Sequence, residues 1–183
     1  MLRPLYSAVR TRRLAFAAQT MAAQGDVLFH GTRCPLDILR DQRIRLPEVG
    51  DHAVSLTRSA RVAAYWAMLP RDEPLDEWPA ILVLDRDRLR SRYRVTPHNY
   101  FGSPPYLASA VQMADEMEER VVDRDTEDVF RYLKGLVVFG LRPLELAELA
   151  AAAPGLLIKP VTRRSVPSRF VELKTDAQLE LAL

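Results

Sequence analysis

The sequence lacks the features that mark several large classes of protein. Its single cysteine, Cys34, has no partner for an internal disulfide, and no cluster of cysteine and histidine has the spacing of a zinc site. We therefore expect a reducing compartment, the cytoplasm, and no bound metal. No stretch approaches eighteen consecutive apolar residues, so we expect no integral membrane association. No internal repeat or long low-complexity linker divides the 183 residues, of which 48% are hydrophobic, enough to bury a core.

Acidic residues are absent from the first 25 positions, although the whole chain has a net charge of only +2. A basic, acid-free helix is typical of an organellar presequence or of a membrane-surface helix, but we favour a helix packed on the flank of the domain. At 100° per residue its apolar face would hold Leu2, Leu5, Tyr6, Val9 and Phe16. We therefore divide the chain into a basic helical arm, residues 1–24, and one domain, residues 25–183.

Apolar runs and turn residues predict an alternation of strands and helices in the domain. The expected strands are residues 27–29, which enter a loop at 30–32, and residues 53–57, 80–84, 116–122, 136–139 and 156–158. The expected helices follow Pro35, Ser59, Asp125 or Thr126, Pro143 and Thr175, with a short solvated helix and turn after Asp85. Residues 99–115 are typical of an ordered loop rich in Gly, Pro and aromatic residues. Because the elements show no steady βαβ rhythm, we expect an α+β fold with a mostly antiparallel or mixed sheet.

Three groups of residues, far apart in the sequence, contain side chains that could take part in catalysis or binding. The first is His30-Gly31-Thr32, at the end of a predicted strand. The second runs from Ser55 to Tyr65 across a strand-to-helix turn, and the third is a glutamate cluster, 116–119, leading into a strand. Each group taken alone is ordinary: a histidine in a loop, an aromatic residue in a core, a solvated strand start.

Together, in this order, the three groups resemble the conserved blocks of the ADP-ribosyltransferase superfamily. Residues 28–32, Leu-Phe-His-Gly-Thr, with Ile-Leu at 38–39, are similar to the first block of the diphtheria-toxin and poly-ADP-ribose polymerase branch. Residues 54–59, Val-Ser-Leu-Thr-Arg-Ser, leading to Tyr65, resemble the second block, and residues 116–121, Glu-Met-Glu-Glu-Arg-Val, resemble the third. The resemblance implies transfer of ADP-ribose from NAD to a macromolecular acceptor, protein or nucleic acid, with release of nicotinamide.

The resemblance also implies a role for each matching residue. A carboxylate stabilises positive charge that develops on the ribose as the nicotinamide bond breaks, which is the role of Glu118, with Glu119 as its rival because neighbouring strand residues point to opposite faces. His30 would bond a ribose hydroxyl of the adenosine half, the backbone of Gly31 would read the nicotinamide amide, and Tyr65 would stack on the ring. Arg58 would pair with the pyrophosphate or, equally, form a surface salt bridge. The implied catalytic residues are Glu118, Glu119 and His30, and the implied NAD-binding residues are His30, Gly31, Thr32, Ser55, Thr57, Arg58 and Tyr65.

Two features leave other interpretations open. Ser-x-Thr at 55–57 and Glu-x-Glu at 116–118 look like the blocks of the arginine-class transferases, whose first motif has an arginine where this chain has His30. The same fold also includes RNA 2′-phosphotransferases, in which His52 and Arg58 would grip a phosphate, and catalytically silent domains that bind a partner. A toxin, an effector and a housekeeping modifier would share these residues.

Overall fold

The computed structural model describes residues 8–22, 25–47, 52–69, 78–98, 117–122 and 124–162, and all statements below concern these residues. The helices are α1 (Ala8–Met21), α2 (Pro35–Asp41), α3 (Ala60–Met68), α4 (Arg86–Arg92) and α5 (Pro143–Ala152), with a 3₁₀ turn, η2, at Val129–Arg131. The strands are β1 (Val27–Thr32), β2 (Arg43–Ile44), β3 (Ala53–Thr57), β4 (Ala80–Asp85), β5 (Val95–His98), β6 (Glu118–Val122), β7 (Thr126–Glu127), β8 (Leu133–Phe139) and β9 (Ile158–Val161).

Seven of the described strands form one mixed sheet in the order β5-β6-β3-β1-β4-β8-β9, and β2 pairs with β7 in a small second sheet. All neighbours in the large sheet are antiparallel except β8 and β9, which are parallel. The expected α+β class and mixed sheet are therefore confirmed. In the sheet β3 lies between β1 and β6. Residues near 30, 55 and 118, far apart in the sequence, therefore lie on three adjacent strands.

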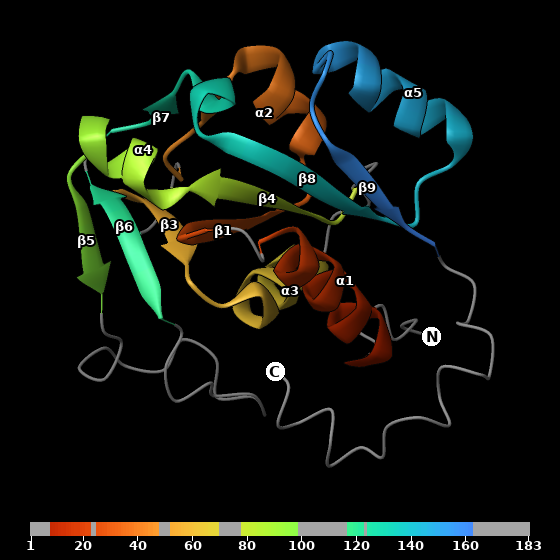
Figure 1. Ribbon diagram of the computed structural model, residues 1–183, viewed down its shortest axis with the longest axis horizontal. Coiled ribbons are helices and arrows are strands. Elements are labelled where there is room, and N and C mark those ends of the chain that lie inside the picture. The colour runs from red at the N-terminus through yellow and green to blue at the C-terminus, as the bar shows by residue number, and fades with distance from the viewer. Residues whose placement is uncertain are drawn as a thin grey trace.

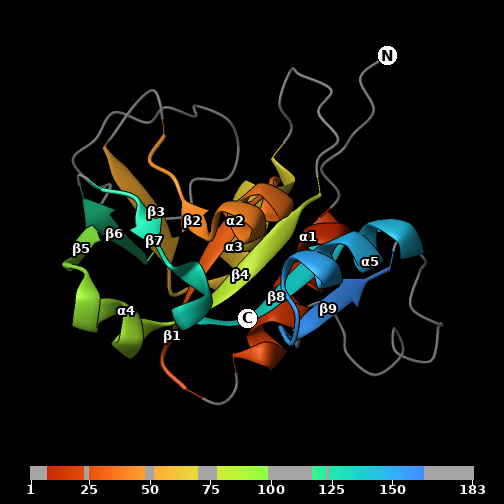
Figure 2. The same ribbon diagram turned by 90° about the horizontal axis from the view of Figure 1, so that it is seen from above.

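Helices cover both faces of this sheet (Figure 1). On one face, α1 and α3 pack on each other and bury Leu14, Phe29 and Ile81 with a set of alanines. On the other face, α2 and α5 lie side by side over the sheet, as Figure 2 shows, and bury Leu39 and Leu149 against its apolar side chains. Strand β4 is fully buried from Ala80 to Leu84, as its unbroken apolar run predicts for a central strand.

The helices that frame the later argument begin where the sequence predicts. The Oγ atom of Ser59 accepts a hydrogen bond from the amide of Val62 and caps α3, and the carboxylate of Asp85 caps α4 through the amide of Arg88. Pro35 occupies the first turn of α2. These caps turn the chain directly from a strand into a helix and so fix where the ends of β3 and β4 lie.

Helix α1 belongs to the core of the domain, and its predicted apolar face was wrong. Val9 and Phe16 are 63% and 66% exposed, whereas Leu14 and Ala18 are completely buried. The reason is the close approach to α3, whose buried face is lined by alanines, so that small side chains of α1 fit the contact better than large ones. Leu2, Leu5 and Tyr6 lie outside the described residues.

The predicted helix after Asp125 was also wrong. Thr126 is completely buried and pairs with Ile44 in the second sheet, and Asp128 has a left-handed backbone (φ 52°), which no helix can continue through. The Asp125 carboxylate accepts a hydrogen bond from the amide of Leu46 instead of capping a helix. Pairing with β2, which no sequence pattern predicts, determines the structure of residues 126–127.

Other predictions were shifted or lie outside the described chain. The last described strand, β9, begins at Ile158, two residues later than expected, and tolerates Pro160 because it is the edge strand of the sheet. Strands β2 and β5 were not predicted. The loop at 99–115, Glu116 and the helix after Thr175 lie outside the described residues.

Gly31 gives a direct test of how β1 and α3 are packed. A Cβ atom at this position would lie 2.0 Å from the carbonyl oxygen of Ala63 in α3, a clash that the two backbones cannot relieve without moving apart. We expect Gly31→Ala to cost about 1–3 kcal/mol or more of unfolding free energy, and to lower the Tm by about 2–4 °C per kcal/mol.

Thermal unfolding followed by circular dichroism measures this change. The matched control is Gly155→Asn, because Gly155 has a left-handed φ of 80° that asparagine tolerates, and a Cβ atom there would meet no other atom within 4 Å. Equal Tm values for wild type and Gly31→Ala would contradict the close packing of α3 on β1.

Candidate active site

The two strands that carry the first two sequence groups separate almost as soon as they meet. Strand β1 pairs with β4 along all six of its residues, but with β3 only at Phe29 and Thr57. A cleft of about 390 Å³ opens beside the unpaired part, a size within the range of small-molecule sites. The residues that line it are Phe29, His30, Gly31, Arg45, Pro47, Ala53, Val54, Ser55, Leu56, Thr57, Val62, Ala63, Trp66 and Glu118.

His30 bridges the two strands at the point where they part. Its Nδ1 atom lies 3.0 Å from the carbonyl oxygen of Ser55. Since a carbonyl only accepts, Nδ1 carries the proton. Burial lowers the pKa of the imidazole, and the hydrogen bond to Ser55 opposes that shift only in part, so the ring is neutral near pH 7. In this tautomer Nε2 is an acceptor, suited to a hydroxyl group of a ligand.

Glu118 enters the cleft from β6, opposite Thr57 of β3. The residue is 5% exposed, and its Oε1 atom accepts a hydrogen bond of 2.8 Å from Nε of Arg120, itself buried. The other oxygen, Oε2, is buried without a hydrogen-bond partner among the described residues. Burial of an unpartnered carboxylate oxygen is costly, so a protein keeps one mainly where a ligand completes it.

Glu119 lies on the opposite face of β6 and is engaged there. Its two oxygens accept hydrogen bonds from Nη2 and Nε of Arg86 at 2.6 and 3.0 Å, and Nε of Arg58 is 3.5 Å from one of them. The Glu119 side chain is 3% exposed and Arg86 is 18% exposed. Of the two rival glutamates, the geometry therefore places Glu118 in the cleft and gives Glu119 a structural ion pair.

The remaining sequence-predicted residues divide into two sets. Gly31, Ser55 and Thr57 line the cleft with His30 and Glu118. Thr32 does not: its Oγ1 atom accepts a hydrogen bond from the amide of Cys34 and stabilises the turn into α2. Arg58 and Tyr65 are likewise not among the residues that line the cleft.

Two residues of the cleft were missed by the sequence analysis. Trp66 lines it with Val62 and Ala63 of α3, is 40% exposed, and contacts Tyr65 edge to face with ring centroids 5.5 Å apart. Both Tyr65 and Trp66 lie one helical turn beyond Val62, so the sequence alone carries no signal that selects Trp66. Arg45 is the second, and no motif in the sequence points to it.

The neutral state of His30 predicts a dependence of stability on pH. The pKa of His30 is lowered in the folded protein, while in the unfolded chain it returns to the ordinary value near 6.5. Between these values the unfolded chain binds more protons, so the stabilisation present above pH 6.5 is lost as the pH falls through the folded pKa. We expect a loss of at most about 1.4 kcal/mol per pH unit from this group.

Urea unfolding between pH 8 and pH 5 measures this loss, with wild type and His30→Gln as the compared proteins. His30→Gln should flatten the slope of unfolding free energy against pH. An unchanged slope in His30→Gln would show that the histidine is not buried in its neutral form.

The two faces of β6 predict opposite sensitivities of the neighbouring glutamates. Glu119→Gln leaves the largely buried Arg86 with a weakened partner and should cost about 3 kcal/mol. Glu118→Gln also leaves a buried arginine, Arg120, with a neutral partner, but it keeps the single hydrogen bond to Arg120 and relieves the burial of the other carboxylate oxygen, so it should cost less than Glu119→Gln, which weakens two hydrogen bonds to Arg86. Urea denaturation of both variants checks the order, and a larger loss for Glu118→Gln would contradict the assignment of faces.

Neither the described helices nor the described clusters of side chains point to a membrane or a metal. No helix in the described part of the chain is long and apolar enough to cross a bilayer. Within the same residues no three His, Cys, Asp or Glu side chains are grouped so that they could hold a metal ion. The chain matches no protein-family model, no curated protein and no solved structure.

Proposed function

We propose that the protein is an NAD-dependent ADP-ribosyltransferase of the fold that the three sequence blocks resemble. The observation that carries the proposal is the convergence of His30, Ser55 and Glu118 on one cleft, from three strands that are far apart in the sequence. The buried Oε2 atom of Glu118, which has no hydrogen-bond partner in the described part of the chain, supports it further, because the chemistry requires a carboxylate at the ribose.

In the proposed reaction the bond between nicotinamide and the ribose anomeric carbon breaks, and its electron pair leaves with the nicotinamide. Positive charge develops on the ribose, and the Glu118 carboxylate stabilises it. Oε2 accepts a hydrogen bond from the ribose 2′-hydroxyl, while Arg120 holds Oε1. A nucleophile of the acceptor then forms the new bond to the anomeric carbon and releases its proton to solvent or to a base.

The other cleft residues orient the dinucleotide. Neutral His30 accepts a hydrogen bond from a ribose hydroxyl at Nε2, because Nδ1 donates to Ser55. Gly31 lines the cleft, where its backbone would read the nicotinamide amide, as the resemblance implies. In place of Tyr65 we assign the stacking on nicotinamide to Trp66, whose half-exposed indole lines the cleft.

The contacts of Arg58 favour this reaction over the RNA 2′-phosphotransferase interpretation. That reaction needs a histidine and several arginines around one phosphate, and the sequence offered His52 and Arg58 for it. Arg58 instead pairs with Glu119 on the far face of β6, and His52 is exposed and outside the cleft lining. A silent binding domain would have no use for the buried carboxylate of Glu118, and the experiment below separates such a domain from the transferase.

The single cysteine, Cys34, is exposed and forms no disulfide, and we keep the cytoplasm as the proposed compartment.

Release of nicotinamide from NAD is the measurement that tests the proposed function. We expect wild type to release nicotinamide and to transfer the labelled adenylate half of NAD to acceptors in a lysate. Glu118→Gln should reduce the rate by about 10²–10³-fold, the usual effect of removing one electrostatic stabiliser of a transition state. Its circular dichroism spectrum should match that of wild type.

Glu119→Gln is the matched control, because it changes the same functional group one residue away on the other face. Assayed below its midpoint of unfolding, it should retain activity within a few-fold of wild type. Undiminished nicotinamide release by Glu118→Gln would contradict the mechanism. A wild-type protein that neither binds nor cleaves NAD would favour the silent binding domain.

A further inference from the structure

We propose that Arg45 binds the pyrophosphate of the dinucleotide and that Asp41 competes with the pyrophosphate for the Arg45 guanidinium. This inference rests on the proposed function and extends it to a residue that none of the three motifs contains. It assigns a phosphate subsite to the part of the cleft lined by Arg45 and Pro47, and it assigns to Asp41 the role of lowering the affinity of that subsite.

The charges of the cleft point to Arg45. Among the described residues that line it, Glu118 is the only acid and Arg45 is the only cation. NAD carries a positive nicotinamide at one end and two phosphate charges in its middle, so it needs one group of each sign. Arg58, which the motifs suggest for the pyrophosphate, pairs with buried Glu119 instead.

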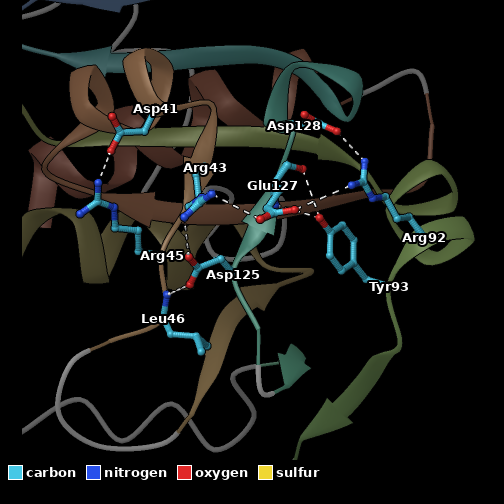
Figure 3. A network of polar contacts seen from close by, with 9 residues as sticks. All are labelled: Asp41, Arg43, Arg45, Leu46, Arg92, Tyr93, Asp125, Glu127 and Asp128. Atoms are coloured by element: carbon cyan, nitrogen blue, oxygen red, sulfur yellow. Dashed lines mark hydrogen bonds and ion pairs between the residues drawn. The ribbon is translucent and has the colours of Figure 1, made fainter.

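The short strand β2 sets where Arg45 lies. The left-handed turn at Gln42, whose amide bonds Ile38, ends α2 and leads into the strand. Ile44 is 2% exposed, so its neighbours Arg43 and Arg45 point away from the core on the same side. The amide of Leu46 donates a hydrogen bond of 2.8 Å to Asp125, which anchors the segment just beyond Arg45 (Figure 3).

The same network separates a structural arginine from an available one. Arg43 pairs with Asp125 at 3.4 Å and with Glu127 at 3.3 Å, and so joins β2 to β7 and its flanking residues (Figure 3). Arg45 makes one ion pair within the described chain, with Asp41 four residues earlier. Its side chain is 71% exposed, and that of Asp41 is 41% exposed. Such a surface pair contributes only about 0–1 kcal/mol, so a pyrophosphate can displace Asp41.

Arginine suits this role because its guanidinium forms two parallel hydrogen bonds with phosphate oxygens. The anchored backbone keeps Arg45 among the residues that line the cleft, and the weak pair with Asp41 leaves the guanidinium able to turn toward a ligand. Asp41 lines the neighbouring groove with Arg43 and Arg45 but not the cleft itself. Arg45 therefore lies between a competing carboxylate on one side and the proposed dinucleotide on the other.

Isothermal titration calorimetry with ADP-ribose, ADP and nicotinamide tests the assignment in the full chain. Arg45→Ala should weaken the binding of ADP-ribose and of ADP by about tenfold or more, the effect of losing charge-assisted hydrogen bonds. It should leave the binding of nicotinamide unchanged, because that probe has no phosphate. Arg43→Ala is the matched control: Arg43 stands two residues before Arg45, in β2, and does not line the cleft, so its removal should leave all three affinities within about twofold of wild type.

Asp41→Asn supplies a test of opposite sign. Removal of the competing charge should strengthen the binding of ADP-ribose by about two- to fivefold, in line with the small energy of an exposed ion pair. The gain should vanish in the double variant Asp41→Asn, Arg45→Ala, since Asp41 acts only through Arg45. A purely structural role for the pair predicts a loss in both single variants.

The outcomes distinguish this inference from the proposed function. Binding of ADP-ribose to wild type with unchanged affinity in Arg45→Ala would overturn the subsite and leave the transferase intact. Weakening of nicotinamide binding by Arg45→Ala to the same degree would also overturn it, since the loss would then reflect the shape of the cleft. Absence of binding of all three probes to wild type would overturn the proposed function itself.

Discussion

The single point of pairing between β1 and β3 is the constraint on which the rest of the site depends. Beyond Phe29 and Thr57 the two strands no longer pair, and the His30 imidazole bonds the Ser55 carbonyl across the gap. Strand β1 can part from β3 because β4 pairs with it along its whole length. Gly31 then allows α3 to approach the β1 backbone, and α3 carries Trp66 to the cleft. Removal of any of these contacts changes the shape of the same opening.

The distribution of charge follows from the alternation of side chains along β6. Glu119 is turned toward Arg86, which also pairs with Asp26, so this face ties β6 to α4 and to the start of β1. Glu118, one residue earlier, is consequently turned into the cleft, with one buried oxygen that has no hydrogen-bond partner among the described residues. Burial of this oxygen costs free energy, while the ion pair between Glu119 and Arg86 holds the other face of the strand. The cleft lining thus contains one acid, Glu118, and one cation, Arg45, among the described residues, the two signs of charge that NAD requires.

Much of the fold could be predicted because local signals and tertiary packing agree. The apolar run at 80–84, Ser59 before α3 and Pro35 at the start of α2 each specify their element, and packing changes none of them. The failures lie where packing overrides the local signal. Val9 and Phe16 of α1 face outward because the contact between α1 and α3 is filled mainly by alanines around Leu14, and Thr126 joins a strand because β2 is beside it. The motifs predicted His30, Ser55 and Glu118 at one site. The choice between Tyr65 and Trp66 depends on the rotation of α3 about its axis. The place of Arg45 at the cleft depends on the two-residue strand β2 before it, which has no sequence signature.

A crystal structure of the protein with NAD, or with ADP-ribose and nicotinamide, tests the central claim most directly. The account predicts a dinucleotide in the opening between β1 and β3, with the anomeric carbon of the nicotinamide ribose beside Oε2 of Glu118 and the ring against Trp66. A dinucleotide bound on another surface, or one whose ribose lies away from Glu118 while Glu119 remains paired with Arg86, would contradict it.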